Sequence, residues 1–175
     1  MSVCMVATDG SQHADHALTI ASSLAKTDNS KLILVHVVSH DEPPTSVSEG
    51  MQVEFGRELE TRLSSSSEIY KNLGQMPDYG VIQSQHAEIS RVMNTIYGEQ
   101  LLKHAKDKLR ELGHESVESL LLEGDPADQL VAQAREHRAD MVVMGCRGLG
   151  RLKSLFGSVS QQVAHELDCR VVLVK

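Results

Sequence analysis

The chain has 175 residues, a length typical of one domain, with 41% hydrophobic residues, 23% charged residues and a net charge of −7. This acidic balance argues against a general binder of nucleic acid or of anionic membranes, because such proteins carry a basic surface. Aromatic residues make up only 3% of the chain, so its core must be aliphatic.

Targeting signals and cysteine usage favour a cytoplasmic protein. The first residues, MSVCMVATDG, lack the basic stretch and apolar run of a signal peptide. No apolar run approaches the ~18 residues that a membrane span needs. The three cysteines, Cys4, Cys146 and Cys169, form no CxxC pair, which favours free thiols in a reducing compartment.

Alternating strand and helix signals run along most of the chain. Short apolar runs predict five strands, at Val3–Thr8, Leu32–Val38, Val117–Leu122, Met141–Met144 and Val171–Val174. Most of these runs are continuous, which is typical of parallel strands covered on both faces. Apolar residues at helical spacing predict helices at Ala14–Ala25, Ala127–Arg138 and Ser158–Leu167. The pattern predicts an α/β fold with one open, doubly wound sheet, whose ligand lies beyond the carboxyl ends of the strands.

Asp9 follows the first predicted strand and so lies at the predicted ligand edge. Its carboxylate could accept hydrogen bonds from ribose hydroxyls or from water on a metal ion. A turn or helix-capping role shared with Ser11 is an equally good interpretation. His13 and His16 are three residues apart on the following helix, but no third ligand is evident, so we predict no metal site.

Residues 40–98 carry few strand signals and do not fit a compact α/β unit. The spacing of Phe55, Leu59 and Leu63 predicts a short amphipathic helix. A longer helix is predicted from near His86 to Leu112, with Gly98 as a possible bend. We interpret the chain as one domain, residues 1–175, with an inserted helical and loop segment at about residues 45–85. So long a connection is typical of a lid, a binding loop or a mobile insertion.

The glycine-rich turn from Gly145 to Ser160 is the strongest chemical signal in the sequence. It directly follows the strand predicted at Met141–Met144 and ends where a helix should start. Gly157 and Ser158 lie at that helix start, where free N–H groups and the helix dipole favour an anion. The turn contains three cations and no acid, although the chain is acidic overall. A plain glycine turn with Ser158 as N-cap is the competing interpretation, and the strand context and the cations favour a phosphate site.

Five motifs in order resemble the universal stress protein family. They are Asp9-Gly-Ser with the helix after it, Leu34-Val-His-Val-Val38, Gly124-Asp-Pro-Ala127, Asp140-Met-Val-Val-Met-Gly145 with the glycine turn, and Cys169-Arg-Val-Val-Leu-Val174. The resemblance covers roughly residues 1–40 and 100–175. It implies a three-layer, Rossmann-like fold of the adenine nucleotide alpha hydrolase type, with a five-stranded parallel sheet. It also implies a homodimer formed through the last strand, Val171–Val174.

The resemblance further implies that ATP, ADP or AMP binds, with or without Mg²⁺, through a G-x2-G-x9-G-[ST] motif. The residues that would face adenine and ribose are Ala7, Asp9 and Val37. Those that would hold ribose and phosphates are Met144, Gly145, Arg147, Gly148, Gly157, Ser158, Val159 and Ser160. This chain has eight residues between Gly148 and Gly157 where the family pattern has nine. We place the deletion near Leu155-Phe156 and expect it to affect affinity more than fold.

Three functions are compatible with these features. The first is an ATP-binding regulatory protein of the stress response, with slow hydrolysis at most, because no general base lies beside the turn. The second is a protein-interaction module of the same fold that binds no nucleotide. The third is an enzyme on a related fold, such as an ATP-pyrophosphatase or a nucleotidylyl transferase, which ranks last because neither SGGxDS nor HIGH occurs.

Overall fold

The computed structural model describes residues 2–39, 79–148 and 156–175, and these include all five predicted strands. The strands are β1 (Val3–Ala7), β2 (Lys31–Val38), β3 (Glu118–Glu123), β4 (Met141–Gly145) and β5 (Arg170–Val174). They form one parallel sheet in the order β3-β2-β1-β4-β5. The predicted α/β fold is therefore confirmed. The strand order reverses direction between β1 and β4, and a doubly wound sheet binds ligands at such a switch point.

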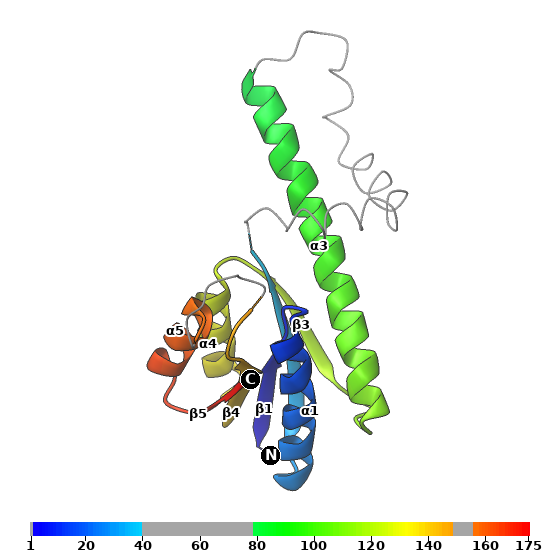
Figure 1. Ribbon diagram of the computed structural model, residues 1–175, viewed down its shortest axis with the longest axis vertical. Helices are drawn as coiled ribbons and strands as arrows, with labels where there is room; N and C mark the ends of the chain where they lie inside the picture. Colours follow the sequence, from blue (N-terminus) through cyan, green and yellow to red (C-terminus); the bar gives the residue numbers. More distant parts are fainter. Residues whose placement is uncertain (1, 40–78, 149–155) are drawn as a thin grey trace. The chain divides into compact units, whose positions relative to one another are not determined.

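Four helices accompany the sheet in the described residues: α1 (Gln12–Thr27), α3 (Tyr79–Glu111), α4 (Pro126–Glu136) and α5 (Ser158–Glu166). Figure 1 shows α4 and α5 together on one face, while α1 covers the other. Two of the helix starts follow from sequence chemistry. The Ser11 hydroxyl accepts a hydrogen bond from the Ala14 amide at the start of α1, and the Asp125 carboxylate accepts from the first amides of α4.

Two aliphatic clusters lie on the two faces of the sheet. Leu32 and Leu34 of β2 pack with α1 and with the part of α3 that contains Leu102 and Leu109. Ile33 and Val35, which alternate with Leu32 and Leu34 along β2, pack with α4 and α5 on the other face. The central strands are buried on both faces, which is why they occur in the sequence as continuous apolar runs.

The chain divides into two compact units, one of residues 1–39 and 98–175 and the other of residues 40–97. The first unit contains the whole sheet. Of the second unit, the structure describes residues 79–97, which are helical and bury Met93 and Ile96. The long helix predicted from near His86 begins earlier, at Tyr79, and continues through Gly98. The short helix predicted around Phe55–Leu63 lies outside the described residues.

None of the described helices combines the length and the apolar character that a membrane crossing demands.

Candidate functional site

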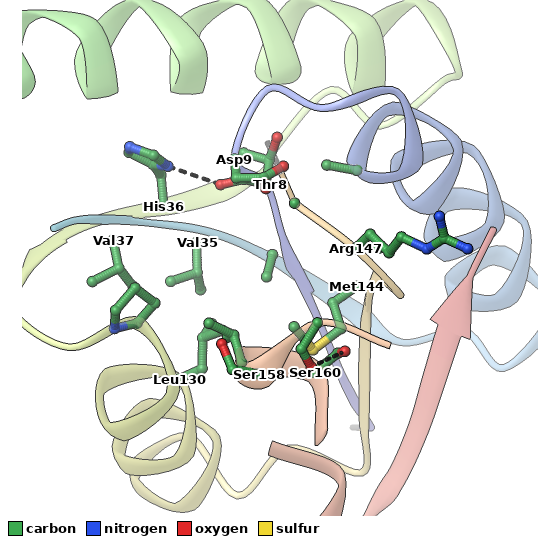
Figure 2. Close-up of a pocket in the computed structure, with 17 residues that line it drawn as sticks. Thr8, Asp9, Val35, His36, Val37, Leu130, Met144, Arg147, Ser158 and Ser160 are labelled. Carbon is green, nitrogen blue, oxygen red and sulfur yellow. Dashed lines mark hydrogen bonds between the residues drawn. The ribbon is translucent and has the colours of Figure 1, made fainter. Parts of the chain in front are cut away.

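A cavity of about 320 Å³ opens where β1, β2 and β4 end, at the switch point of the sheet. We call it the switch-point cavity, and Figure 2 shows the side chains that line it. Its size is at the lower end of the range of about 300–1,000 Å³ that is usual for small-molecule sites. Every residue that the sequence predicted for a nucleotide site lines this one cavity: Ala7, Asp9, Val37, Met144, Gly145, Arg147, Gly148, Gly157, Ser158, Val159 and Ser160.

The lining also contains residues that the sequence analysis missed: Thr8, Ala14, Val35, His36, Pro126 and Leu130. Two signals could have found some of them. Val35 is two residues before Val37 and therefore lies on the same face of β2. Pro126 and Leu130 follow the Gly124-Asp-Pro-Ala motif, which was recognised but not connected with a ligand.

The wall on the α4 side of the cavity is apolar. Figure 2 shows Val35 and Val37 pointing toward Leu130, with Met144 farther along the same side. Leu130 and Met144 belong to the core cluster that α4 and α5 share with the sheet, and Val37 packs against it. This wall can accept a flat apolar surface, because no charged side chain contributes to it.

The turn after β1 is held by hydrogen bonds of its own residues. Asp9 Oδ1 accepts from the Ser11 amide at 3.0 Å, and Ser11 in turn caps α1. The second oxygen, Asp9 Oδ2, lies against Gly148, so closely that a Cβ at position 148 would collide with it. The turn role considered for Asp9 is thus present, and the same carboxylate also lines the cavity.

The two ends of the glycine-rich turn are joined by main-chain and hydroxyl contacts. The Gly157 amide donates to the Cys146 carbonyl at 2.8 Å. The Ser160 hydroxyl lies 3.0 Å from the same carbonyl and 2.9 Å from that of Gly157. These contacts fix where α5 begins, although residues 149–155 of the turn lie outside the described part of the chain.

The first turn of α5 offers main-chain donors to the cavity. Its N-cap is Gly157, which has no side chain to accept from the helix amides, and Ser158 is the first helical residue. The idea that Ser158 is the N-cap is therefore wrong. The Gln161 amide donates to the Gly157 carbonyl, which is the first hydrogen bond within the helix. The amides of the three lining residues before it, Ser158, Val159 and Ser160, therefore have no acceptor within the helix. An anion is the natural partner of such a helix end.

Arg147 contributes its main chain rather than its guanidinium. Figure 2 shows its side chain pointing away from the other labelled lining residues. Its Nε is buried without a hydrogen-bond partner in the described structure, and its carbonyl accepts from the Ser11 hydroxyl at 3.4 Å. A phosphate contact by this guanidinium would require another side-chain rotamer.

His36 is the buried titratable group of the cavity lining. Burial lowers the pKa of its imidazole below the ordinary value, although the hydrogen bond to the Thr8 carbonyl and the charge of Asp9 act in the opposite direction. A neutral ring at neutral pH follows. In the part of the chain that the structure describes, no three His, Cys, Asp or Glu side chains come together as a metal site would require.

Comparison with known proteins identifies relatives over the full length of the chain. The model of the universal stress protein family matches residues 1–175. The stress response protein NhaX of Bacillus subtilis is 29% identical, over 98% of this chain and 96% of its own. A universal stress protein of Thermus aquaticus is 28% identical over the same shares.

Solved structures share the fold. The universal stress protein UspA of Lactobacillus plantarum superposes with a TM-score of 0.66 at 15% identity, covering 99% of this chain and 97% of that one. A universal stress protein solved in complex with cAMP gives 0.60 at 23% identity, covering 99% and 97%. One from Archaeoglobus fulgidus in complex with dAMP gives 0.56 at 20% identity, covering 100% and 98%. From the full-length match to the family model, this chain belongs to the universal stress protein family.

Proposed function

We propose that this chain binds an adenine nucleotide (ATP, ADP or AMP) in the switch-point cavity and acts as a cytoplasmic regulatory protein of the stress response. The observation that carries the proposal is the meeting of residues 7–9, 35–37, 144–145, 147–148 and 157–160 around one cavity. The two family members solved with cAMP and dAMP support an adenine ligand. The free cysteines of the chain fit a reducing compartment.

The adenine ring fits best against the apolar wall, beside the main chain of Val37. The last paired residues in the β1–β2 register are Ala7 and Val35, and the Thr8 amide donates to the Val35 carbonyl. In a parallel strand the amide and carbonyl of alternate residues point to the same neighbour. The main-chain groups of Val37 therefore face the same side as those of Val35, beyond the end of β1. They offer one donor and one acceptor to the edge of a base.

The phosphates fit at the start of α5. The amides there lack a side-chain cap, and Ser158 is exposed with its hydroxyl available. Asp9, at the opposite side of the cavity, suits the ribose hydroxyls, because a carboxylate accepts from both. When the nucleotide binds together with Mg²⁺, we expect the ion to lie beside the phosphates.

Isothermal titration with ATP and with AMP, each with and without Mg²⁺, tests the proposal on the wild-type protein and on Gly157→Val. The nearest heavy atoms to a Cβ at position 157 are 3.7 Å away, so a larger residue there is compatible with the fold but intrudes on the cavity. We expect the wild type to bind and the variant to lose at least about tenfold in affinity, or 1.4 kcal/mol. Thermal unfolding of both proteins serves as the control for folding.

Two outcomes would contradict parts of the proposal. Equal heats for wild type and Gly157→Val would remove the phosphate site from the start of α5. A wild type that binds none of the nucleotides would instead favour the interaction module of the same fold.

We also propose that the chain forms a homodimer through β5, Val171–Val174. β5 lies at one edge of the sheet, paired on one side only with β4. Its residues 171–174 are half-buried and apolar. Such an edge invites pairing with a second strand.

A further inference from the structure

His36 lies on the side of the sheet opposite the apolar wall of the cavity. Side chains alternate along β2, and Val35 and Val37 point to the α4 side. Figure 2 shows His36 directed the other way, toward Thr8 and Asp9. With only 7% of its surface exposed, the imidazole lines the cavity beside Thr8 and Asp9 and is no part of the apolar wall that would hold a base.

The His36 imidazole forms a hydrogen bond with the Thr8 carbonyl, at the point where the main-chain hydrogen bonds between β1 and β2 end. The Thr8 amide still donates to the Val35 carbonyl at 2.9 Å, as the next rung of the ladder. The Thr8 carbonyl lies 2.8 Å from His36 Nδ1, and since a carbonyl can only accept, Nδ1 carries the proton and donates. Thr8 is thus held through both main-chain groups, and the residue that follows it is Asp9.

The ring is itself fixed from behind by α3. A Cβ at Gly98 would lie 2.8 Å from His36 Cδ2 and 2.8 Å from Leu121 Cδ1. Real Cβ atoms do not approach so closely, so the α3 main chain packs on the ring because residue 98 is a glycine. Glycine is less favourable than alanine inside a helix, and the close approach to His36 is a reason for a glycine at position 98. The α3 main chain at Gly98 therefore lies against the imidazole.

We propose that His36 is a positioning residue of the nucleotide site, which holds the Thr8 carbonyl so that the Asp9 carboxylate faces the cavity, with Gly98 of α3 keeping the ring in place. The inference rests on the proposed function, because it assigns Asp9 to the ribose. It adds that affinity for the nucleotide depends on His36, which acts through Thr8 and Asp9, and on Gly98, which is not part of the cavity lining.

The test compares His36→Leu with His36→Asn, using two readouts. Leucine fills similar space without a donor, while the asparagine amide donates from nearly the position of Nδ1. The first readout, without ligand, is hydrogen exchange of the Ser11 amide, which donates to Asp9 Oδ1 at 3.0 Å and so reports on the turn. The second is ATP affinity by titration.

We expect His36→Leu to exchange the Ser11 amide at least tenfold faster and to lose at least tenfold in ATP affinity, and His36→Asn to recover most of both. His114→Leu is the matched control. His114 is also partly buried and lies with Nε2 3.0 Å from the Ser22 hydroxyl, but it is not part of the cavity lining. This variant should leave both readouts unchanged even if it lowers stability.

Several results would overturn the inference. One is a His36→Leu protein with wild-type exchange and affinity, and another is an asparagine variant no better than the leucine variant. If wild type binds no nucleotide, the proposed function fails, and the exchange of Ser11 alone decides whether His36 positions the turn. If His36→Leu does not fold, Gly98→Ala replaces it, because the added methyl presses on the ring. Unchanged exchange in Gly98→Ala would then count against the inference.

Discussion

Asp9 and Gly148 lie in contact where the two loops that follow β1 and β4 meet. The carboxylate of Asp9 occupies the place that a side chain at position 148 would need. Gly148 itself is exposed, so the glycine serves the contact with Asp9 and not the core. The contact with the Asp9 carboxylate explains why residue 148 is a glycine, which its position in a glycine-rich turn alone does not.

Gly148→Ala is expected to weaken ATP binding by about tenfold, because the methyl group displaces the Asp9 carboxylate from the cavity. The same substitution made in an Asp9→Ala background should cost almost nothing further, since the group that it displaces is gone. Titration of the four proteins forms a double-mutant cycle. Additive losses in the double variant would show that Gly148 acts independently of Asp9.

At the scale of elements, the residue that caps a helix determines whether the first amides of that helix are available to a ligand. α1 and α4 begin with a capping side chain: the Ser11 hydroxyl accepts from the Ala14 amide, and the Asp125 carboxylate accepts from the amides of Ala127 and Asp128. α5 begins with Gly157 and no such side chain. The first two helices are therefore anchored by their own sequence, while the first turn of α5 keeps its donors for another partner. Because α4 supplies Pro126 and Leu130 to the cavity, its cap also supports the apolar wall.

Asp125→Ala should lower the free energy of unfolding by about 0.5–2 kcal/mol, because the amides of Ala127 and Asp128 lose their acceptor at 2.9 and 3.0 Å. Asp128→Ala is the matched control. It removes an exposed carboxylate from the same helical turn, one that accepts a hydrogen bond from the Gln162 side chain and caps no described helix. Urea unfolding should show the larger loss for Asp125→Ala, and equal losses would mean that the cap adds nothing beyond charge.

At the scale of the whole molecule, the free edge of β5 follows from its hydrogen-bond pattern. The Arg170 amide donates to Asp140 and the Val174 carbonyl accepts from Cys146, so the even-numbered residues of β5 face β4. The main-chain groups of Val171 and Leu173 therefore point to the open side. The proposed dimer would form through these groups.

Val171→Pro is expected to convert the proposed dimer to a monomer with the fold intact, because it removes an amide that the β4–β5 ladder does not use. Val172→Pro makes the same chemical change one residue later, where the amide faces β4, and should destabilise the fold. Light scattering gives the molar mass and circular dichroism the folded fraction. A wild type with the mass of one chain, or a Val171→Pro protein that stays dimeric, would contradict pairing through β5.

Much of the fold was determined by the sequence alone. The five apolar runs predicted the strands to within one residue at each end. The central strands are apolar throughout because they are buried on both faces. The recognised motifs also predicted eleven lining residues, because they follow strands whose carboxyl ends meet at one edge in a parallel sheet. Gly157 and Ser158 were placed at a helix start, which α5 has.

Only the tertiary structure decided which other side chains complete the site. Leu130 is far from β2 in sequence, and an apolar residue on a helix face gives no sign of whether it meets core or cavity. The resemblance placed Arg147 among the residues that would hold ribose and phosphates, but the direction of its side chain depends on the packing of neighbouring elements, which the sequence does not give. In the sequence, nothing distinguishes His36 from the other residues of its apolar strand as part of a site. Its contacts with Thr8 and Gly98 exist only in the folded structure. Local pattern specifies elements, whereas contacts between distant segments specify the site.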